Sequence, residues 1–328
     1  METIVHPWGA DDHIGMCFFR SLRKNTNAIK TAKFWEDLNK ARLNKKLSFL
    51  VGNGINMHIS SSIPSWNRLI KDIALHYKID IDSYNALFPT EQYSAIVYEL
   101  CEDDVRQRIL DAYGDSTIKG LESDFQIYSD MFADYDVPVL STNVDSFLHA
   151  GLNQYDFPLS QFDIETNPNY EHKSMWSINH YYAQHEIMNS ASDFAIWHIH
   201  GQISHKESLR FGLIDYGKLI ARINPSLDSN NLVSNCDGKT WLEPFFRNHI
   251  CIVGLGLSQV EVGIRYLLLR RAQILKKKNM NKLRKCWYLY VKEYANEDTL
   301  QFCKSLGIET IEFPCFNSLY DQLIQHSK

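Results

Sequence analysis

Short, continuous runs of apolar residues recur along the chain between stretches of helical periodicity. Six of these runs predict strands, at Leu47–Val51, Val137–Leu140, Phe194–Ile199, His249–Val253, Cys286–Val291 and Thr310–Phe313. Because the runs are apolar at successive positions rather than at alternate ones, they are typical of parallel strands buried on both faces. The pattern therefore predicts an α/β fold with a mostly parallel sheet and helices on both of its faces.

Helical periodicity fills most of the intervals around these runs. Apolar residues spaced three and four apart predict helices at Ala28–Lys45, Pro64–Tyr77 and Val260–Ile274, and a mostly helical stretch at Tyr84–Met131. The stretch from Leu148 to Asp193 is too long for a simple crossover helix, so we interpret it as an insertion near the mouth of a site.

The first predicted strand ends in a glycine turn, Gly52-Asn53-Gly54-Ile55-Asn56. Two closely spaced glycines after a strand allow backbone amides to approach a pyrophosphate, with no Cβ in the way. The third glycine of the usual dinucleotide fingerprint is missing, and we expect no helix directly after the turn. An ordinary turn explains this motif equally well.

The second predicted strand ends in Ser141-Thr142-Asn143-Val144-Asp145. Asn143 and Asp145 are two residues apart, so their side chains can share one side of an extended segment. An amide there could orient a water or a ribose hydroxyl, and a carboxylate could hold a hydroxyl or an amide. The alternative is that this pair caps a helix that starts near Asp145.

Two further strand ends carry candidate chemistry. His198-Ile199-His200-Gly201 would present a general base to a cleft, although a histidine satisfied within the core is the alternative and no third ligand accompanies the pair for zinc. Gly254-Leu255-Gly256-Leu257-Ser258 precedes a helix and could hold adenosine or phosphate. Tight packing of a strand-to-helix turn would explain its glycines as well.

Composition narrows the classes of protein to which the chain could belong. It has 328 residues, 45% of them hydrophobic and 22% charged, which suits a globular protein with a real core. Its net charge of −5 gives no overall positive field for nucleic acid, so we expect nucleic acid only through a partner. A basic stretch, Arg265–Lys285, is read as a solvated helix end, with a docking face for an acidic partner as the lesser alternative.

No sequence feature indicates a membrane, a secretory route or a structural metal. The longest apolar run, near Ile250–Leu257, is too short to cross a bilayer, and Met1–Asp12 lacks the pattern of a signal peptide, so we expect a cytoplasmic protein. The seven cysteines have no C-x-x-C spacing, so neither a zinc site nor a disulfide framework is expected. They are Cys17, Cys101, Cys236, Cys251, Cys286, Cys303 and Cys315.

Taken in order, these motifs resemble those of the sirtuin-like family. Relatives carry a G-A-G-I-S turn, then I-P-S-W, T-T-N-Y-D, an H-G strand end and a G-Y/F-S-x-x-D turn. The matching segments here are Gly52–Asn56, Ile63–Trp66, Ser141–Asp145, His200-Gly201 and Gly256–Glu261. Sirtuin deacylases usually carry a four-cysteine zinc module that this chain lacks. The chain is therefore more similar to the bacterial sirtuin-like NAD hydrolases of antiviral defence, an assignment that Asp215-Tyr216 also favours.

The resemblance implies a Rossmann-like domain at 46–328, with helical insertions at about 78–133 and 150–192, preceded by a helical extension at 1–45. It also implies that NAD is the substrate. Asn143 and His200 would be catalytic, with Asn143 positioning the ribose or the attacking water and His200 acting as general base or orienting the ribose hydroxyls. The implied NAD-binding residues are Gly52, Asn53, Gly54, Asn56, Thr142, Asp145, Gly254 and Ser258.

The sequence departs from the family pattern at four of these positions. Asn53 stands where relatives have alanine, Asn56 where they have serine, Val144 where they have tyrosine and Glu261 where aspartate is common. Asn53 adds a bulky amide beside the expected phosphates. Base specificity and hydrolytic competence could therefore differ from those of relatives.

Three functions remain open at the level of sequence. The first is an NAD glycohydrolase that depletes the cofactor as the effector of an antiphage defence system. The second is a catalytically silent NAD- or nucleotide-binding module of a defence complex, and the third is an NAD-dependent deacylase or ADP-ribosyl transferase, which the missing zinc module disfavours. Because a toxic hydrolase must stay silent until needed, we expect a homo-oligomer or a separate activating subunit.

Overall fold

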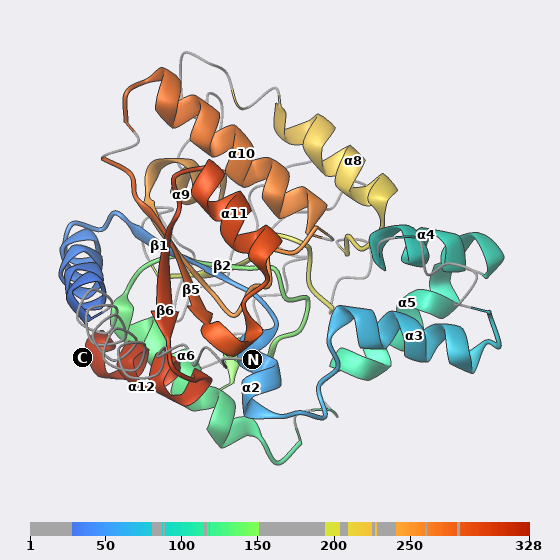
Figure 1. The fold of residues 1–328 in the computed structure, drawn as a ribbon. Helices are drawn as coiled ribbons and strands as arrows, with labels where there is room; N and C mark the ends of the chain where they lie inside the picture. The colour runs from blue at the N-terminus through green and yellow to red at the C-terminus, as the bar shows by residue number, and fades with distance from the viewer. Residues whose placement is uncertain are drawn as a thin grey trace, which may run out of the picture.

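The computed structural model shows one parallel sheet at the centre of the molecule (Figure 1). It describes residues 28–80, 87, 89–100, 102–114, 117, 119–150, 194–203, 209–224, 227, 241–259, 261–280 and 283–328. The strands are β1 (Leu47–Val51), β2 (Val139–Ser141), β3 (Ile196–His198), β4 (His249–Val253), β5 (Cys286–Val291) and β6 (Glu309–Phe313).

The strand order is β3-β2-β1-β4-β5-β6, and every described pair of neighbours is parallel. This is the order of a doubly wound Rossmann sheet, in which the chain runs outward from β1 in both directions. The predicted α/β class and mostly parallel sheet are confirmed. Three strands, β1, β4 and β5, have the predicted bounds, and the other three shift by one or two residues.

Helices follow the strands on both sides of the sheet. They are α2 (Gly54–Ile59), α3 (Trp66–His76), α4 (Pro89–Glu99), α5 (Glu102–Tyr113), α6 (Glu122–Tyr135), α8 (Leu213–Ile223), α9 (Leu242–Arg247), α10 (Val262–Lys277), α11 (Glu297–Ser305) and α12 (Phe316–Ser327), with a further helix over 28–43 and short 3-10 turns η3 (Phe147–His149) and η7 (Lys292–Tyr294).

One expectation about the first turn is wrong. Helix α2 begins directly at Gly54, although no helix was expected after the glycine turn. Asn53 already has helical backbone angles, and its carbonyl accepts a hydrogen bond from the Met57 N–H at 3.0 Å. The helix is short and buries Ile55 and Asn56, so tertiary burial rather than intrinsic propensity accounts for it.

Two hydrophobic cores cover the two faces of the sheet. Leu50 belongs to the core beneath α8, α9 and α10, whereas its neighbours Phe49 and Val51 belong to the core beneath the 28–43 helix, α6 and α12. In Figure 1, α10 and α11 lie on one side of the strands and α6 and α12 on the other. Burial on both faces explains why the strands read as continuous apolar runs.

A third core lies among α3, α4 and α5, beside the sheet (Figure 1). It also includes Phe147 and Phe211, which follow β2 and β3. The expected insertion at about 78–133 contains α4 and α5, but it also contains α6, which packs on the sheet through Phe132. The expected insertion at 150–192 lies outside the described residues except for Ala150, and so do residues 1–27 of the expected extension at 1–45.

None of the helices that the structure describes combines the length and apolar character needed to cross a bilayer.

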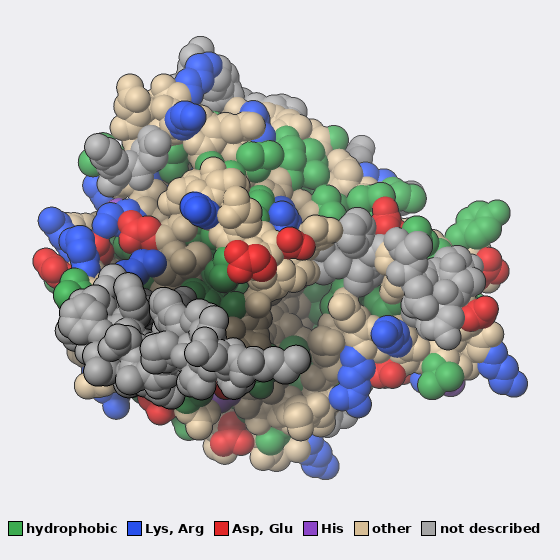
Figure 2. All heavy atoms as spheres, in the orientation of Figure 1, with side chains coloured by type: hydrophobic (Ala, Val, Ile, Leu, Met, Phe, Trp, Pro, Cys, Tyr) green, Lys and Arg blue, Asp and Glu red, His purple; other side chains and the backbone are tan. Residues whose placement is uncertain are grey.

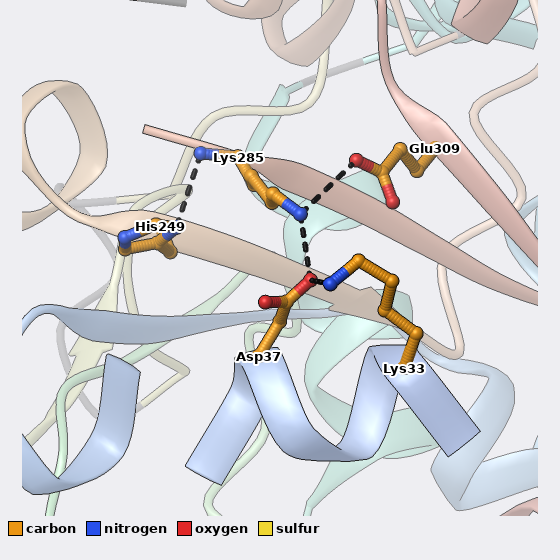
Figure 3. Close-up of polar contacts among 5 residues, drawn as sticks. All are labelled: Lys33, Asp37, His249, Lys285 and Glu309. Atoms are coloured by element: carbon orange, nitrogen blue, oxygen red, sulfur yellow. Dashed lines mark hydrogen bonds and ion pairs between the residues drawn. The ribbon is translucent and has the colours of Figure 1, made fainter. Parts of the chain in front are cut away.

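A cluster of partly exposed ion pairs joins the 28–43 helix to the amino ends of the strands (Figure 3). Lys285, just before β5, donates to Asp37 Oδ2 at 2.6 Å and lies 3.7 Å from Glu309 Oε1. Lys33 approaches the same Asp37 oxygen at 3.7 Å, and the Lys285 N–H donates to His249 Nδ1 at 3.1 Å. The cluster fixes this helix to three neighbouring strands.

We expect Asp37→Asn to lower the free energy of unfolding by about 1 kcal/mol at neutral pH, because it removes a partly buried ion pair. Burial acts to raise the pKa of Asp37, but the hydrogen bond and charge of Lys285, with Lys33, outweigh it and lower this pKa below 3.8. The contribution of Asp37 is therefore fully present above pH 3.8 and is lost as the pH falls through the lowered folded-state pKa.

Urea unfolding of Asp37→Asn and wild type at several pH values tests this prediction. The exposed residue Asp134 supplies the matched control Asp134→Asn. A difference between Asp37→Asn and wild type no larger than that of the control at pH 7 would contradict the role of the cluster.

Candidate active site

A cavity of about 370 Å³ lies at the carboxyl ends of the strands. Residues that follow β1, β2, β3 and β4 line it, together with the end of β5. In such sheets the ligand crevice forms where the strand order reverses, which here is between β1 and β4. The volume falls in the range of about 300–1,000 Å³ that is usual for small-molecule sites. Figure 2 shows the molecule hollowed near the centre of the view.

The loops after β1 and β4 are held together at this point by three glycines. The Gly54 N–H donates to the Gly254 carbonyl at 2.7 Å, and the Gly52 N–H donates to the Val253 carbonyl at 3.1 Å. A Cβ at Gly54 would lie 2.7 Å from the Gly254 Cα, and one at Gly52 would lie 2.7 Å from the Gly254 carbonyl oxygen. Gly254 itself has a φ of +64°, which favours glycine.

This contact changes the interpretation of the glycine turn. The N–H groups of Gly52 and Gly54 are used within the fold, so they are not free to donate to a phosphate. The glycines are needed because the two backbones touch, which is the packing alternative that the sequence left open for the turn at Gly254. Gly54 and Gly254 line the cavity, whereas Gly52 does not.

Hydrogen bonds from α10 and α11 hold the loop after β4 in an unusual backbone conformation. Leu257 is fully buried with a φ of +47°, a region that residues with a side chain rarely adopt. Its carbonyl accepts from Arg265 Nη1 at 2.9 Å and from Thr299 Oγ1 at 3.2 Å. Thr299 Oγ1 also lies 3.2 Å from the Gly256 carbonyl. These bonds hold the adjacent Ser258 at the wall of the cavity.

Asn143 is held by its backbone, while its side chain faces the cavity. Its N–H donates to Ser141 Oγ at 3.1 Å, and His198 Nδ1 bonds to its carbonyl at 2.9 Å. The side chain is 6% exposed, and Nδ2 has no hydrogen-bond partner within the described part of the chain. A buried amide donor without a partner costs free energy unless a ligand or water satisfies it.

Asp145 is buried and fixed through both carboxylate oxygens. Oδ1 accepts from the Phe147 N–H at 3.1 Å, and Oδ2 accepts from Asn56 Nδ2 at 2.8 Å. Burial raises the pKa of Asp145 to about 7, although the hydrogen bonds from Phe147 and Asn56 act in the opposite direction. Asp145 therefore binds the first N–H of the short 3-10 turn η3, whose N-cap position is Ser146, and it also lines the cavity.

The side-chain amide nitrogens of Asn53 and Asn56 donate hydrogen bonds within the fold. Asn53 Nδ2 donates to the Pro64 carbonyl at 2.9 Å, which also accepts from Tyr113 Oη at 3.0 Å. Asn56 Nδ2 bonds to Asn53 Oδ1 at 3.0 Å as well as to Asp145. Asn56 is fully buried and does not line the cavity. The extra amide of Asn53 thus has a structural use beside the cavity.

The two histidines at the end of β3 have different surroundings. The rings of His198 and His149 stack 5.1 Å apart, with 2.9 Å between their Nε2 atoms. Burial lowers the pKa of His198 to about 4 and that of His149 well below its usual value, so both rings are neutral. His198 is the histidine satisfied within the core, and it supports Asn143 from behind.

His200 lines the cavity and is 5% exposed. Burial lowers its pKa to about 4, and a hydrogen bond to the Thr142 backbone opposes this shift. A bond with that effect is donated by the ring, while Nε2 has no partner among the described residues. At neutral pH Nε2 is therefore the unprotonated nitrogen of a side chain that lines the cavity.

Of the residues expected from the sequence, eight line one cavity. They are Asn53, Gly54, Thr142, Asn143, Asp145, His200, Gly254 and Ser258. The side chain of Thr142 bonds to the Val51 carbonyl at 3.1 Å, so its role in the wall is structural. Gly52 and Asn56 lie behind the wall.

The sequence did not identify two pairs of aromatic residues that line the cavity. Trp66 stacks on Phe211 with ring centroids 5.0 Å apart, and the ring centroids of Tyr294 and Phe316 are also 5.0 Å apart. Trp66 belongs to a motif that the sequence did single out, Ile63–Trp66, but its contact with Phe211 joins distant segments. Spacing along the chain carries no signal for such contacts.

Charge and metal-binding groups in the cavity are sparse. Arg210 is the one Lys or Arg among the described residues that line it, and Asp145 and Glu261 are the carboxyl groups. Within the described ranges, no group of three or more His, Cys, Asp or Glu side chains could hold a metal ion.

No family model matches this chain, and no curated protein matches it. Function is therefore inferred from the residues of the cavity.

We expect Gly54→Ala to lower the free energy of unfolding by about 1–3 kcal/mol, because the added Cβ meets the backbone of Gly254 and the two loops must separate. The matched control is Gly217→Ala in α8, where a Cβ meets nothing within 4 Å. It should raise stability by about 0.5–1 kcal/mol, since alanine is favoured over glycine within a helix. Urea unfolding of both variants measures the difference, and equal stability of the two would contradict the tight contact.

Proposed function

We propose that this protein is an NAD glycohydrolase that cleaves NAD to nicotinamide and ADP-ribose. One observation carries the proposal: two buried polar atoms, Asn143 Nδ2 and His200 Nε2, lack partners in the described part of the chain and belong to side chains that line a cavity at the switch point of a Rossmann sheet. A donor and an acceptor left unsatisfied at the same cavity favour a bound polar ligand over a purely structural role.

An extended dinucleotide would lie along the residues that line the cavity. In this proposal the nicotinamide-side ribose lies against Asn143 and His200, and the diphosphate lies near the Gly254–Ser258 loop. The adenosine then extends toward Tyr294 at the end of β5. Asp145, with both oxygens fixed, engages the nicotinamide side.

The groups on the cavity wall suit a reaction that passes through positive charge. The bond between ribose C1′ and nicotinamide N1 breaks, and its electron pair neutralises the pyridinium ring while the ribose becomes oxocarbenium-like. Asn143 orients the ribose or the water that adds to C1′. A water that adds to such a cation becomes strongly acidic, so even a weak base can take its proton.

His200 fits the role of that weak base. Its pKa of about 4 keeps Nε2 unprotonated at neutral pH, with the ring orientation set by its bond to the Thr142 backbone. His200 accepts the proton from the attacking water or orients the ribose hydroxyls. The products are nicotinamide, ADP-ribose and a proton.

Hydrolysis is favoured over the deacylase alternative because the seven cysteines have no spacing that could form the four-cysteine zinc module of a deacylase. We further propose, from the resemblance to bacterial sirtuin-like hydrolases, that the protein acts as an antiphage effector by depleting NAD. A homo-oligomer or an activating subunit would then supply control.

Purified full-length protein should release nicotinamide from NAD, and Asn143→Ala and His200→Ala should each lower kcat/KM by at least about 100-fold, the usual effect of losing a group that positions or stabilises the transition state. Exposed residues of the same types supply the controls Asn44→Ala and His76→Ala, which should keep wild-type activity. Chromatographic separation of nicotinamide and ADP-ribose measures turnover, over a range of protein concentrations that allows oligomers to form.

Wild-type turnover in both cavity variants would overturn the assignment of the site. Binding of NAD by calorimetry with no turnover at any protein concentration would instead favour the silent nucleotide-binding module.

A further inference from the structure

Glu261 has a carboxyl group, lines the cavity and has no role in the steps proposed above. It precedes α10 and is partly buried. Its backbone is fixed, because its N–H donates to the Ser258 carbonyl at 3.0 Å and its carbonyl accepts from the Arg265 N–H at 2.9 Å. Its side chain makes no hydrogen bond or ion pair with the part of the chain that the structure describes, although it lines the cavity.

Its neighbours relate Glu261 to the catalytic end of the cavity. Tyr216 lies with its ring 5.2 Å from that of His200, and a Cβ at Gly263 would lie 2.9 Å from the same tyrosine ring. Burial raises the pKa of Tyr216 above its usual range, and the nearby charge of Glu261 adds to this effect. Tyr216 thus lies between the ring of His200 and the start of α10, and His200, Tyr216 and Glu261 all line the cavity.

The ligand group that Glu261 faces must be one that a carboxylate can bind. The negative charge of Glu261 would repel a diphosphate. Arg210 is the one Lys or Arg among the described residues that line the cavity, and no ion pair joins it to Glu261 in the described part of the chain. Sugar hydroxyls can donate to it, and developing positive charge would be attracted to it. Burial raises the pKa of Glu261 to about 7, because no described positive charge stabilises its carboxylate form.

We infer that Glu261 accepts hydrogen bonds from the hydroxyls of the nicotinamide-side ribose and that its carboxylate stabilises the positive charge that forms on this ribose. The inference rests on the proposed function. As the C1′–N1 bond breaks, the electron pair leaves with nicotinamide and the charge moves from the pyridinium ring to C1′ and the ring oxygen. Glu261 forms no covalent bond; water adds to C1′ and loses its proton to His200. A fixed carboxylate near the ribose therefore favours the transition state over bound NAD.

Binding of two product fragments tests the ribose contact without turnover. ADP-ribose contains the nicotinamide-side ribose and ADP lacks it. We expect Glu261→Gln to weaken ADP-ribose binding about tenfold or more, because a hydrogen bond to a charged group is lost, and to leave ADP binding within about twofold. Isothermal titration calorimetry on the full-length chain measures both. An equal loss for both ligands, no loss for either, or no binding of ADP-ribose to wild type would overturn the contact.

Turnover tests the role in catalysis. Glu261→Gln should lower kcat for NAD about 100-fold and raise KM about tenfold, because NAD carries the same ribose hydroxyls as ADP-ribose, whereas Glu261→Asp, which keeps the charge, should retain most of the activity. The control Glu297→Gln changes an exposed glutamate in the first turn of α11 and should match wild type. Wild-type kcat in Glu261→Gln would overturn the catalytic role.

The inference and the proposed function can fail separately. Loss of ADP-ribose binding in Glu261→Gln, in a protein whose wild type never hydrolyses NAD, would overturn the glycohydrolase and support Glu261 as a ribose-binding residue. NAD hydrolysis by wild type with unchanged ADP-ribose binding in Glu261→Gln would do the reverse.

Discussion

The arrangement of the molecule depends on the contact between the loops that follow β1 and β4. Gly54 and Gly254 approach so closely that a Cβ on either would meet the backbone or helix start of the other loop. This contact lies where the strand order reverses, so it fixes the two halves of the sheet relative to each other. Asn143 and His200 are positioned from one half and Ser258 from the other. A shift of the glycine contact would therefore change the distances across the whole cavity.

The fold was largely predictable from the sequence, and the site only in part. Strands buried on both faces leave continuous apolar runs, so the bounds of β1, β4 and β5 could be read directly. The residues at the strand ends could also be read, because the carboxyl ends of parallel strands converge. The sequence could not separate packing from binding: Gly52, Asn53 and Asn56 were expected to contact NAD, yet their donors bond within the fold. Nor did spacing distinguish His200 from His198, which differ only through the partners that the fold brings to them.

The cavity combines fully satisfied polar groups with a few unsatisfied ones, and this contrast is informative. Asp145 has partners for both oxygens, and the Asn143 backbone is bonded at both its N–H and its carbonyl. Such rigid support allows the remaining polar atoms to stay without a partner instead of moving to find another one. Leaving those atoms without partners costs free energy of folding, which the three hydrophobic cores offset, as is common at functional sites.

The parallel sheet also determines when the cavity can form. Asn248, which precedes β4, bonds to Ser48 Oγ in β1 at 2.9 Å across 200 residues of chain. Contacts between such distant segments form late in folding, because a long loop must close before they give any stabilisation. During synthesis β1 leaves the ribosome long before its central neighbour exists. A nascent chain that ends before β4 thus contains Asn143 and His200 but lacks the part of the cavity wall that follows β4, so the cavity cannot form until β4 has been synthesised.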